Sequence, residues 1–423
     1  GKTSTVLNML RAFRRLGLAP ERMALAAPTG RAARRMTESI LQGLSRVRDS
    51  SLEDEGLATL KGVTLHRLLG YSPARNRFAY SAANPLPAEL VIVDEVSMVD
   101  LVLMRRLLEA VDPRRTRLIL LGDRDQLPSV EAGAVLADFL RLMMTEPAFA
   151  DRMGTLTQSH RSGDAILEAA AWVNQGGAGA PPFARHALQS EEGDVEVTWP
   201  ATGCLHLETD QPPPALIDSW LELVFPSAYL DLVRQVGAGE AAPDSAELHG
   251  LYHQLFTYLE GGRMLTLTRR GPLGVEGLNR TAARWLRTKG EAFFSGEMLH
   301  GMPVLIQRND YGRELFNGDV GLILRFADGV FRAVFAGMGR YAVYRVESLP
   351  VHEPAWAMTV HKSQGAEYGR VLLVLPDDPR HRLLTREVIY TGLTRARSLA
   401  VLLGSEAVLR TGSRRRIERE TGP

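Results

Sequence analysis

Apolar residues follow two alternating patterns along the first 120 positions. Short apolar runs, typical of buried strands, stand at Met23–Ala27, Leu90–Val93 and Arg117–Leu121. Between them, apolar residues recur every three or four positions and predict helices over 31–44 and from Asp100. Strands that alternate with helices in this way form a parallel sheet with helices on both faces. We therefore predict an α/β fold.

The pattern changes after about residue 300. Apolar runs within 301–349 are short and closely spaced between turn residues, which predicts a small antiparallel barrel. Strand candidates separated by a helical segment return at Trp356–Val360, Val371–Leu375 and Leu399–Leu403, with the helix beginning at Thr385. The barrel is therefore expected as an insertion in a second α/β domain.

Breaks in the pattern suggest where the domains divide. Gly, Ala and Pro cluster at 174–182 and 236–244 and predict loops around a middle region with weak periodicity. Turn residues at about 71–87 predict a small hairpin inserted into the first domain. We expect a first α/β domain over 1–150, a second over 151–300 and 350–423, and the barrel over 301–349.

Composition narrows the class of protein. The chain has 423 residues, enough for two or three cores, and its net charge of +1 gives no global basic field. Basic clusters at 31–35 and 414–416 leave a polyanionic partner open. The lone Cys204 excludes an intrachain disulfide, is expected in the core, and favours a reducing, cytoplasmic compartment. No apolar run approaches the ~20 residues that cross a bilayer, so no membrane partner is expected.

The chain opens with Gly1-Lys2-Thr3, the last triplet of the phosphate-binding loop G-x-x-x-x-G-K-[ST]. In that loop the lysine meets the β and γ oxygens and the hydroxyl binds Mg²⁺. Helical spacing follows at once, and a helix N-terminus favours an anion. The triplet alone also occurs by chance in many unrelated proteins. With the motifs below it predicts ATP and Mg²⁺ as ligands, and we expect the front half of the loop to precede Gly1.

Two polar clusters follow neighbouring strand candidates. In "ELVIVDEVSMVD", Asp94 could hold Mg²⁺ through its water shell while Glu95 deprotonates an attacking water. The alternative is a pair of solvated acids that end a strand. In "LILLGDRDQLPSV", Gln126 could sense the γ-phosphate, and a polar turn capped by Asp is about as plausible for that stretch alone.

Two arginines are candidates for groups that reach the γ-phosphate from a second domain. Arg161 lies in "TQSHRS" and Arg395 in "YTGLTRARS". A planar guanidinium matches charge that is spread over phosphate oxygens in the transition state. For a lone arginine a surface ion pair or a solvated side chain is the favoured alternative. The context supports Arg395 more than Arg161, and Arg397 is expected to be solvated.

Three further stretches combine Thr, His, Lys, Arg or Gln donors with small residues: "APTGRAARRM", "GVTLHRLLG" and "TVHKSQGAE". Such donors at strand or helix ends suit a phosphodiester backbone. His66 and His361 could instead be surface or satisfied core residues. Metal ligation is disfavoured because no second ligand stands nearby in the sequence.

The order of these motifs resembles that of superfamily 1 helicases, and most closely the RecD family, the alpha subunits of exodeoxyribonuclease V (the RecBCD complex). The closer likeness rests on "RRGPLGVEGLN", "GMPVLIQRND" and "LFNGDVG". It runs from residue 1 to about 404 and covers 175–260 only loosely.

The resemblance implies two RecA-like P-loop motor domains with an SH3-like insertion. It implies an ATP-dependent helicase that moves 5′ to 3′ on single-stranded DNA, the 5′ strand of a duplex end, in recombinational DNA repair. The implied partners are the beta and gamma subunits, in a heterotrimer, and no nuclease site is expected in this chain.

The resemblance also assigns roles to residues. Gly1, Lys2, Thr3, Asp94 and Glu367 would bind the nucleotide, with Thr3 and Asp94 on Mg²⁺ and Glu367 at the ribose. The catalytic group would be Glu95, Gln126, Arg161 and Arg395. The DNA path would be lined by Thr29, Arg31, Thr64, His66, Thr359, His361 and Lys362.

One departure and two alternatives stay open. His160 stands where many relatives carry a tyrosine that stacks on adenine, so the preference for that base is in question. A stand-alone RecD-like helicase is the first alternative, and a nucleotide-regulated single-stranded DNA clamp that does not move is the second. A nuclease is disfavoured, because the sequence has no carboxylate cluster beyond Asp94 and Glu95.

Overall fold

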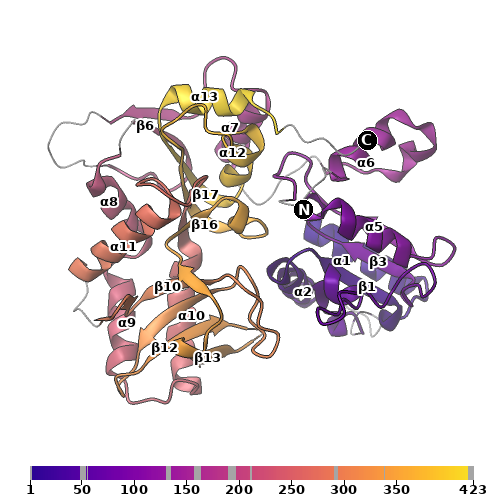
Figure 1. The fold of residues 1–423 in the computed structure, drawn as a ribbon, viewed down its shortest axis with the longest axis horizontal. Helices are drawn as coiled ribbons and strands as arrows, with labels where there is room; N and C mark the ends of the chain where they lie inside the picture. Colours follow the sequence, from indigo (N-terminus) through magenta and orange to yellow (C-terminus); the bar gives the residue numbers. More distant parts are fainter. Residues whose placement is uncertain are drawn as a thin grey trace. The chain divides into compact units, whose positions relative to one another are not determined.

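The computed structural model describes residues 2–47, 54, 56–129, 135–156, 163–188, 197–209, 212–289, 294–337 and 339–417. The chain forms two compact units, Gly1–Arg161 with Glu418–Pro423, and Ser162–Ile417 (Figure 1). Within the described residues, no helix has the length and apolar character to cross a membrane.

The first unit is built on a parallel sheet of four strands in the order β2-β1-β3-β4. These strands are β1 (Met23–Ala27), β2 (Gly62–Thr64), β3 (Leu90–Val93) and β4 (Arg117–Leu120). All four residues of β3 are buried, whereas the edge strand β4 is only half-buried. The central strand therefore anchors the core, and its carboxyl end leads directly to Asp94.

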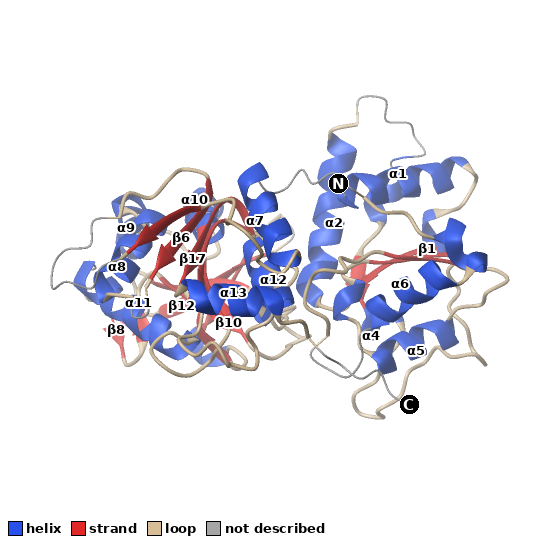
Figure 2. Cartoon of the chain, turned by 90° about the horizontal axis from the view of Figure 1, so that it is seen from above, coloured by secondary structure: helices blue, strands red, loops and turns tan. Residues whose placement is uncertain are grey.

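Helices cover both faces of this sheet. They are α1 (Lys2–Arg15), α2 (Gly30–Ser45), α4 (Leu65–Leu68), α5 (Leu101–Ala110) and α6 (Val135–Thr145), with short 3-10 turns at Pro20–Arg22, Gly56–Thr59, Val96–Met98 and Pro147–Arg152. Leu10 packs with Leu25 and Ile92 on the side of α1 and α2. Val91 packs with Leu107 on the side of α4, α5 and α6. Figure 2 shows the two groups of helices on either side of β1.

The second unit contains a parallel sheet of six strands in the order β15-β7-β16-β17-β6-β5. The strands are β5 (Ala184–Ala187), β6 (Gly203–Glu208), β7 (Gly262–Thr266), β15 (Ala357–Thr359), β16 (Tyr368–Val374) and β17 (Ala396–Leu403). All of β7 and the last five residues of β17 are buried because both faces of the sheet are covered. Cys204 of β6 is buried, as expected, and burial raises the pKa of its thiol to about 12.

Two groups of helices cover this sheet. The helices of the unit are α7 (Asp164–Asn174), α8 (Pro214–Val224), α9 (Ser227–Ala238), α10 (Ala246–Gly261), α11 (Val275–Lys289), α12 (Arg386–Leu393) and α13 (Glu406–Arg414). Leu372 of β16 packs into the core that includes α8, α10 and α11, whereas Leu373 faces α12. A Cβ at Gly392 of α12 would come within 2.8 Å of Leu373, so glycine permits this close packing. Figure 1 shows α12 and α8 on opposite sides of β16 and β17.

An antiparallel sheet of five strands follows α11, in the order β13-β12-β11-β10-β14. Its strands are β10 (Met302–Ile306), β11 (Val320–Arg325), β12 (Phe331–Ala336), β13 (Tyr341–Arg345) and β14 (His352–Pro354), and a small pair precedes it, β8 (Phe294–Ser295) and β9 (Met298–Leu299). Helix α9 packs on it, where Tyr229 donates its hydroxyl to the Gly301 carbonyl at 2.7 Å. The sheet and the parallel layer share one apolar core.

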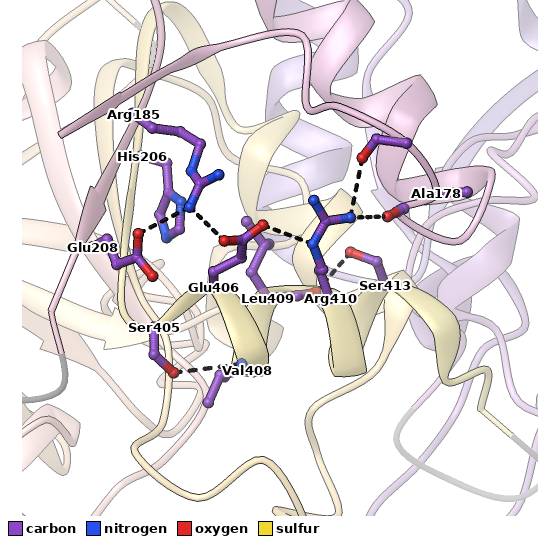
Figure 3. A network of polar contacts seen from close by, with 12 residues as sticks. Ala178, Arg185, His206, Glu208, Ser405, Glu406, Val408, Leu409, Arg410 and Ser413 are labelled. Carbon is purple, nitrogen blue, oxygen red and sulfur yellow. Dashed lines mark hydrogen bonds and ion pairs between the residues drawn. The ribbon is translucent and has the colours of Figure 1, made fainter. Parts of the chain in front are cut away.

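A polar network fixes the edge of the six-stranded sheet (Figure 3). Arg185 of edge strand β5 donates to Glu208 at 2.9 Å and also pairs with Glu406 of α13. Arg410, one turn further along α13, donates to Glu406 at 2.7 Å and to the Gly177 carbonyl at 2.8 Å. The hydrogen bond from Arg410 holds the pKa of Glu406 below its usual value. These contacts tie α13, β5 and the loop after α7 together.

The α/β fold class predicted from the sequence is confirmed by these two parallel sheets. One predicted loop is partly wrong: α9 continues to Ala238, so the loop begins after that residue rather than at 236, because Val236 is fully buried in the core. Within 71–87, isolated antiparallel bridges pair Ser72 with Arg77 and Ser81 with Asn84. The domain limits stay predictions.

Candidate nucleotide and DNA site

Threonines cap the two helices that follow the neighbouring strands β1 and β2 of the first unit. Thr29 caps α2, and its hydroxyl accepts a hydrogen bond from Ala32 N at 3.2 Å. Thr64 caps α4 and accepts from Arg67 N at 3.2 Å. Ala27 pairs with Thr64 across β1 and β2, so the two caps lie at one edge of the sheet. Both helix N-termini present backbone N–H groups there.

Glu95 is held in an unusual position directly after β3. Its backbone has φ 53°, in the left-handed region that residues other than glycine rarely occupy. Its N–H donates to Asp94 Oδ1 at 2.8 Å, and the next residue, Val96, donates to the Leu121 carbonyl at 2.9 Å. The residue is 8% exposed, and its buried Oε2 atom has no hydrogen-bond partner within the part of the chain that the structure describes. A buried carboxylate oxygen in this state can accept a hydrogen bond from a ligand.

Gln126 lies after the adjacent strand β4 and is oriented by Asp123. Its Nε2 donates to Asp123 Oδ2 at 3.2 Å, while Asp125 N donates to Oδ1 at 3.0 Å. The Gln126 Oε1 atom is buried without a partner, as is the hydroxyl of Ser97. A Cβ at Gly122 would come within 2.7 Å of the Leu136 side chain, and Ser97 N would lie 3.4 Å from it, so glycine permits close packing at this strand end. Ser97 was not foreseen from the sequence.

The structure describes only some of the residues that are predicted to contact the phosphates. Lys2 is half-buried at the start of α1, and Thr3 belongs to the same helix. Gly1 and Arg161 lie outside the described residues. The roles given to these four residues stay predictions.

Arg395 is a buried residue of the second unit, between α12 and β17. Its Nε donates to the Thr391 carbonyl at 3.2 Å and its Nη1 donates to the Ala366 carbonyl at 3.1 Å. The guanidinium thus stands beside Glu367, which follows Ala366. Glu367 pairs with Arg397, whose Nε lies 3.4 Å from Oε2. Arg397 is exposed whereas Arg395 is buried, so Arg397 is the solvated one of the two arginines, as expected, although it also pairs with Glu367.

Among the residues predicted to line the DNA path, Lys362 has the most defined contact. Its Nζ donates to Glu353 at 2.6 Å, and its N–H donates to the Thr359 hydroxyl at 3.3 Å. Arg269 donates to the same Glu353 carboxylate at 2.8 Å. Sequence reasoning missed Glu353, and it quoted Arg269 only as part of "RRGPLGVEGLN".

The other DNA candidates are distributed over both units. Arg31 lies half-buried in the first turn of α2, and His361 opens the 3-10 turn His361–Ser363. His66 is exposed on α4, where its ring stacks on Phe78 at 6.1 Å and meets the edge of Tyr71 at 5.3 Å.

Two buried acceptor atoms of the first unit fit a ligand that donates hydrogen bonds, such as a water. The buried Glu95 Oε2 and Gln126 Oε1 atoms are acceptors that no group in the described ranges satisfies. Buried polar atoms without partners are rare in native proteins, and a bound water, ion or ligand is one explanation for them. Among the described residues, no three His, Cys, Asp or Glu side chains are arranged to hold a metal by themselves.

Comparisons with known proteins identify both units. The AAA domain family model matches residues 1–132, and the UvrD-like helicase C-terminal domain model matches residues 354–403. Among solved structures, a Pif1 helicase from Candida albicans is 16% identical, with 95% of this chain and 89% of that chain covered and a TM-score of 0.44.

Curated relatives extend over the whole chain. RecBCD enzyme subunit RecD of Mycolicibacterium smegmatis is 38% identical, with 100% of this chain and 70% of that protein covered. The subunit of the same name from Haemophilus influenzae is 32% identical, with 100% and 68% covered. The ATP-dependent RecD2 DNA helicase of Deinococcus radiodurans is 32% identical, with 99% and 47% covered. The chain therefore belongs to the RecD family of superfamily 1 helicases and is an ATP-dependent DNA helicase.

Proposed function

We propose that this chain is the motor subunit of a RecBCD-type complex that uses ATP hydrolysis to move 5′ to 3′ along single-stranded DNA at a duplex end. The buried Glu95 Oε2 atom, which has no hydrogen-bond partner among the described residues, carries this proposal. A passive clamp has no use for a proton acceptor that is buried at a strand end in strained backbone. A hydrolase needs such a group beside the phosphate.

The proposed chemistry divides among residues of the first unit. Lys2 and the N-terminus of α1 bind the phosphates, while Thr3 and Asp94 hold Mg²⁺, which neutralises charge on the phosphate oxygens when bound. Glu95 Oε2 accepts a proton from the attacking water. Gln126 Oε1, held by Asp123, accepts the other O–H, so that both hydrogens of the water are directed away from phosphorus.

Two arginines and a glutamate have further roles in the proposal. Arg395 and Arg161 supply positive charge for the phosphate oxygens in the transition state. The Thr391 and Ala366 carbonyls fix two nitrogens of Arg395, which limits where the remaining nitrogen can point. Glu367 is proposed to contact the ribose, and its pairing with Arg397 would orient it.

The proposed DNA path uses helix caps and polar turns of both units. Phosphate contacts come from the threonines and cations identified above: Thr29, Arg31, Thr64, Thr359, His361 and Lys362. His66 is proposed to stack on a base, because its ring already belongs to an aromatic cluster with Tyr71 and Phe78. We also propose that the five-stranded antiparallel sheet is the SH3-like insertion of the second motor domain.

Partners are proposed from the relatives. The proteins of Mycolicibacterium smegmatis and Haemophilus influenzae are named as RecBCD subunits, which supports assembly of this chain with beta and gamma subunits in the cytoplasm. The stand-alone alternative is supported by the likeness to the RecD2 helicase of Deinococcus radiodurans. This support is weaker, because the chain covers only 47% of that protein.

The test is DNA-stimulated ATP hydrolysis by full-length Glu95→Gln. The amide keeps the shape but cannot accept a proton, so we expect turnover to fall by about 10²- to 10⁴-fold while ATP binding persists. Glu109→Gln is the control, since Glu109 pairs with Arg105 on the exposed face of α5. Strand displacement with 5′ and 3′ tails then separates a directional motor from a clamp. Full turnover in Glu95→Gln would contradict the mechanism.

A further inference from the structure

One carboxylate in the second unit binds two cations that follow different strands. Lys362 Nζ donates to Glu353 Oε1 at 2.6 Å, and Arg269 Nη2 donates to Glu353 Oε2 at 2.8 Å. The parallel strands β15 and β7 pair Thr359 with Thr266, and each cation stands three residues after its threonine. Both cations therefore lie at the same carboxyl edge of the sheet.

The charge and exposure of this group suit an anionic ligand. Two cations and one carboxylate leave a net positive charge. The Glu353 side chain is 13% exposed and that of Arg269 is 50% exposed, so the carboxylate is covered while the guanidinium reaches solvent. A guanidinium carries five N–H donors in a fixed plane, and the bond to Glu353 occupies one nitrogen.

The loop that carries Arg269 is fixed by its own backbone. Val275 N donates to the Thr268 carbonyl at 3.0 Å, and Glu276 N donates to the Arg269 carbonyl at 2.9 Å, which folds the loop onto the start of α11. A Cβ at Gly274 would stand 2.3 Å from the Arg270 carbonyl oxygen, so only glycine fits there. The spacing of "RRGPLGVEGLN" thus serves to hold Arg269 in place.

The chain segment after Glu353 is fixed independently of the two cations. Asn279 of α11 donates to the Pro354 carbonyl at 2.9 Å and to the Ala357 carbonyl at 3.0 Å. Arg263, a buried residue of β7, donates to the Ala355 carbonyl. Since other contacts set its backbone, Glu353 positions the cations rather than being positioned by them.

We propose that Arg269 and Lys362 form one binding site for a phosphodiester group of single-stranded DNA, with Glu353 as the positioning residue that holds both. The site rests on the proposed DNA-motor function and adds Arg269 and Glu353 to it. A guanidinium and an ammonium at one point combine a planar, bidentate donor with a compact charge. Exposed ion pairs contribute little to stability, so the effect is sought in DNA binding.

Binding of a fluorescent oligothymidylate to the full-length protein, measured over a range of salt concentrations, tests the two cations. A phosphate contact on single-stranded DNA contributes about 0.7 to the slope of log K against log salt. Arg269→Gln and Lys362→Gln should each reduce the slope by about that amount. The control is Lys289→Gln, because Lys289 also pairs with a glutamate, Glu222, at 2.7 Å and should leave the slope unchanged. Wild-type slopes in both test variants would overturn the site.

Glu353→Gln tests whether Glu353 positions the two cations. The test is whether the substitution weakens or tightens DNA binding. If the carboxylate only reduced local positive charge, its removal would tighten DNA binding. We expect binding to weaken by roughly tenfold, equivalent to about 1.4 kcal/mol, because both cations lose their common partner. Glu222→Gln is the matched control and should have no effect. Tighter binding by Glu353→Gln would overturn the positioning role.

The outcome for wild type separates this inference from the proposed function. If wild-type protein binds the oligonucleotide and hydrolyses ATP in response, yet the Arg269 and Lys362 variants keep the wild-type slope, only this site is wrong. Failure of the wild type to bind the oligonucleotide would overturn the proposed function and this site together.

Discussion

Asn279 and Ala357 are joined by a reciprocal pair of hydrogen bonds. The Asn279 amide donates to the Ala357 carbonyl at 3.0 Å, and Ala357 N donates back to Asn279 Oδ1 at 2.9 Å. The second amide hydrogen of Asn279 reaches the Pro354 carbonyl at 2.9 Å. One buried side chain therefore fixes the point where the antiparallel sheet returns to β15.

We expect Asn279→Ala to lower the free energy of unfolding by about 2–4 kcal/mol, because it leaves buried backbone groups without partners. Urea denaturation followed by circular dichroism measures the change. Gln254→Ala is the control, since this exposed side chain makes only a 3.4 Å bond on α10 and should stay within about 0.5 kcal/mol of wild type. An Asn279→Ala variant as stable as that control would show that Asn279 is not a structural anchor.

The sequence predicted the elements whose apolar runs are buried locally. β1 and β3 were predicted to the residue, and α2 was predicted to within one residue at each end. β16 begins at Tyr368, three residues before the predicted start, because pairing of Tyr368 with Ala396 extends it beyond its apolar run. The helices of 175–260 escaped prediction, although α8 and α10 bury large side chains such as Trp220 and Tyr252 in the core. In this region the helices depend on tertiary packing, which the local periodicity of the sequence does not reveal.

Site residues were predictable by type and order, but their contacts were not. The sequence identified Asp94 and Glu95 as a pair after a buried strand, yet the left-handed backbone at Glu95 depends on the loops around it. The sequence did not indicate a role for Glu353, because its partner Arg269 stands 84 positions away. Long-range pairs of this kind are decided by the arrangement of strands.

Because the backbone at Glu95 is left-handed, we predict that replacing this residue with glycine makes the protein more stable but less active. Glu95→Gly should raise the free energy of unfolding of the first unit by about 1–2 kcal/mol, since glycine relieves the left-handed conformation and a buried, unpartnered carboxylate is removed. ATP hydrolysis should be lost at the same time. Differential scanning calorimetry and an ATPase assay measure the two effects.

Glu314→Gly is the control for Glu95→Gly. Glu314 has a similar φ of 54° but is exposed, so relief of backbone strain there should stabilise the protein without changing turnover. Destabilisation by Glu95→Gly would mean that the carboxylate has a stabilising partner and would remove the argument for a poised base.

Asp123 is expected to act through Gln126. Asp123→Ala removes the acceptor that orients the Gln126 amide, so kcat for DNA-stimulated ATP hydrolysis should fall by about 10- to 100-fold with little change in KM for ATP. Asp125→Asn keeps the backbone donor to Asp123 and should behave like wild type. A rise in KM with unchanged kcat would instead assign Asp123 to nucleotide binding.

The surroundings of His300 lead us to predict how the free energy of unfolding depends on pH. Burial lowers the pKa of this imidazole to about 4, the Val233 carbonyl opposes that shift, and the nearby Arg325 charge adds to it. Its Nδ1 accepts a hydrogen bond from Arg325 N at 2.9 Å, which requires the unprotonated nitrogen. The unfolded chain takes up a proton near pH 6.5 while the folded chain does not. The stabilisation is therefore complete above about pH 6.5 and is lost as the pH falls toward 4, by about 3 kcal/mol in all.

His300→Asn isolates this contribution, because an amide oxygen can still accept from Arg325 N but does not titrate. Urea denaturation between pH 4 and 7 should show the stability of wild type falling more steeply with acid than that of His300→Asn, with the two curves approaching one another at low pH. His253→Asn, at an exposed position on α10, should follow wild type throughout. Parallel curves for wild type and His300→Asn would show that His300 is protonated equally in the folded and unfolded chain, which its buried position and its bond to Arg325 oppose.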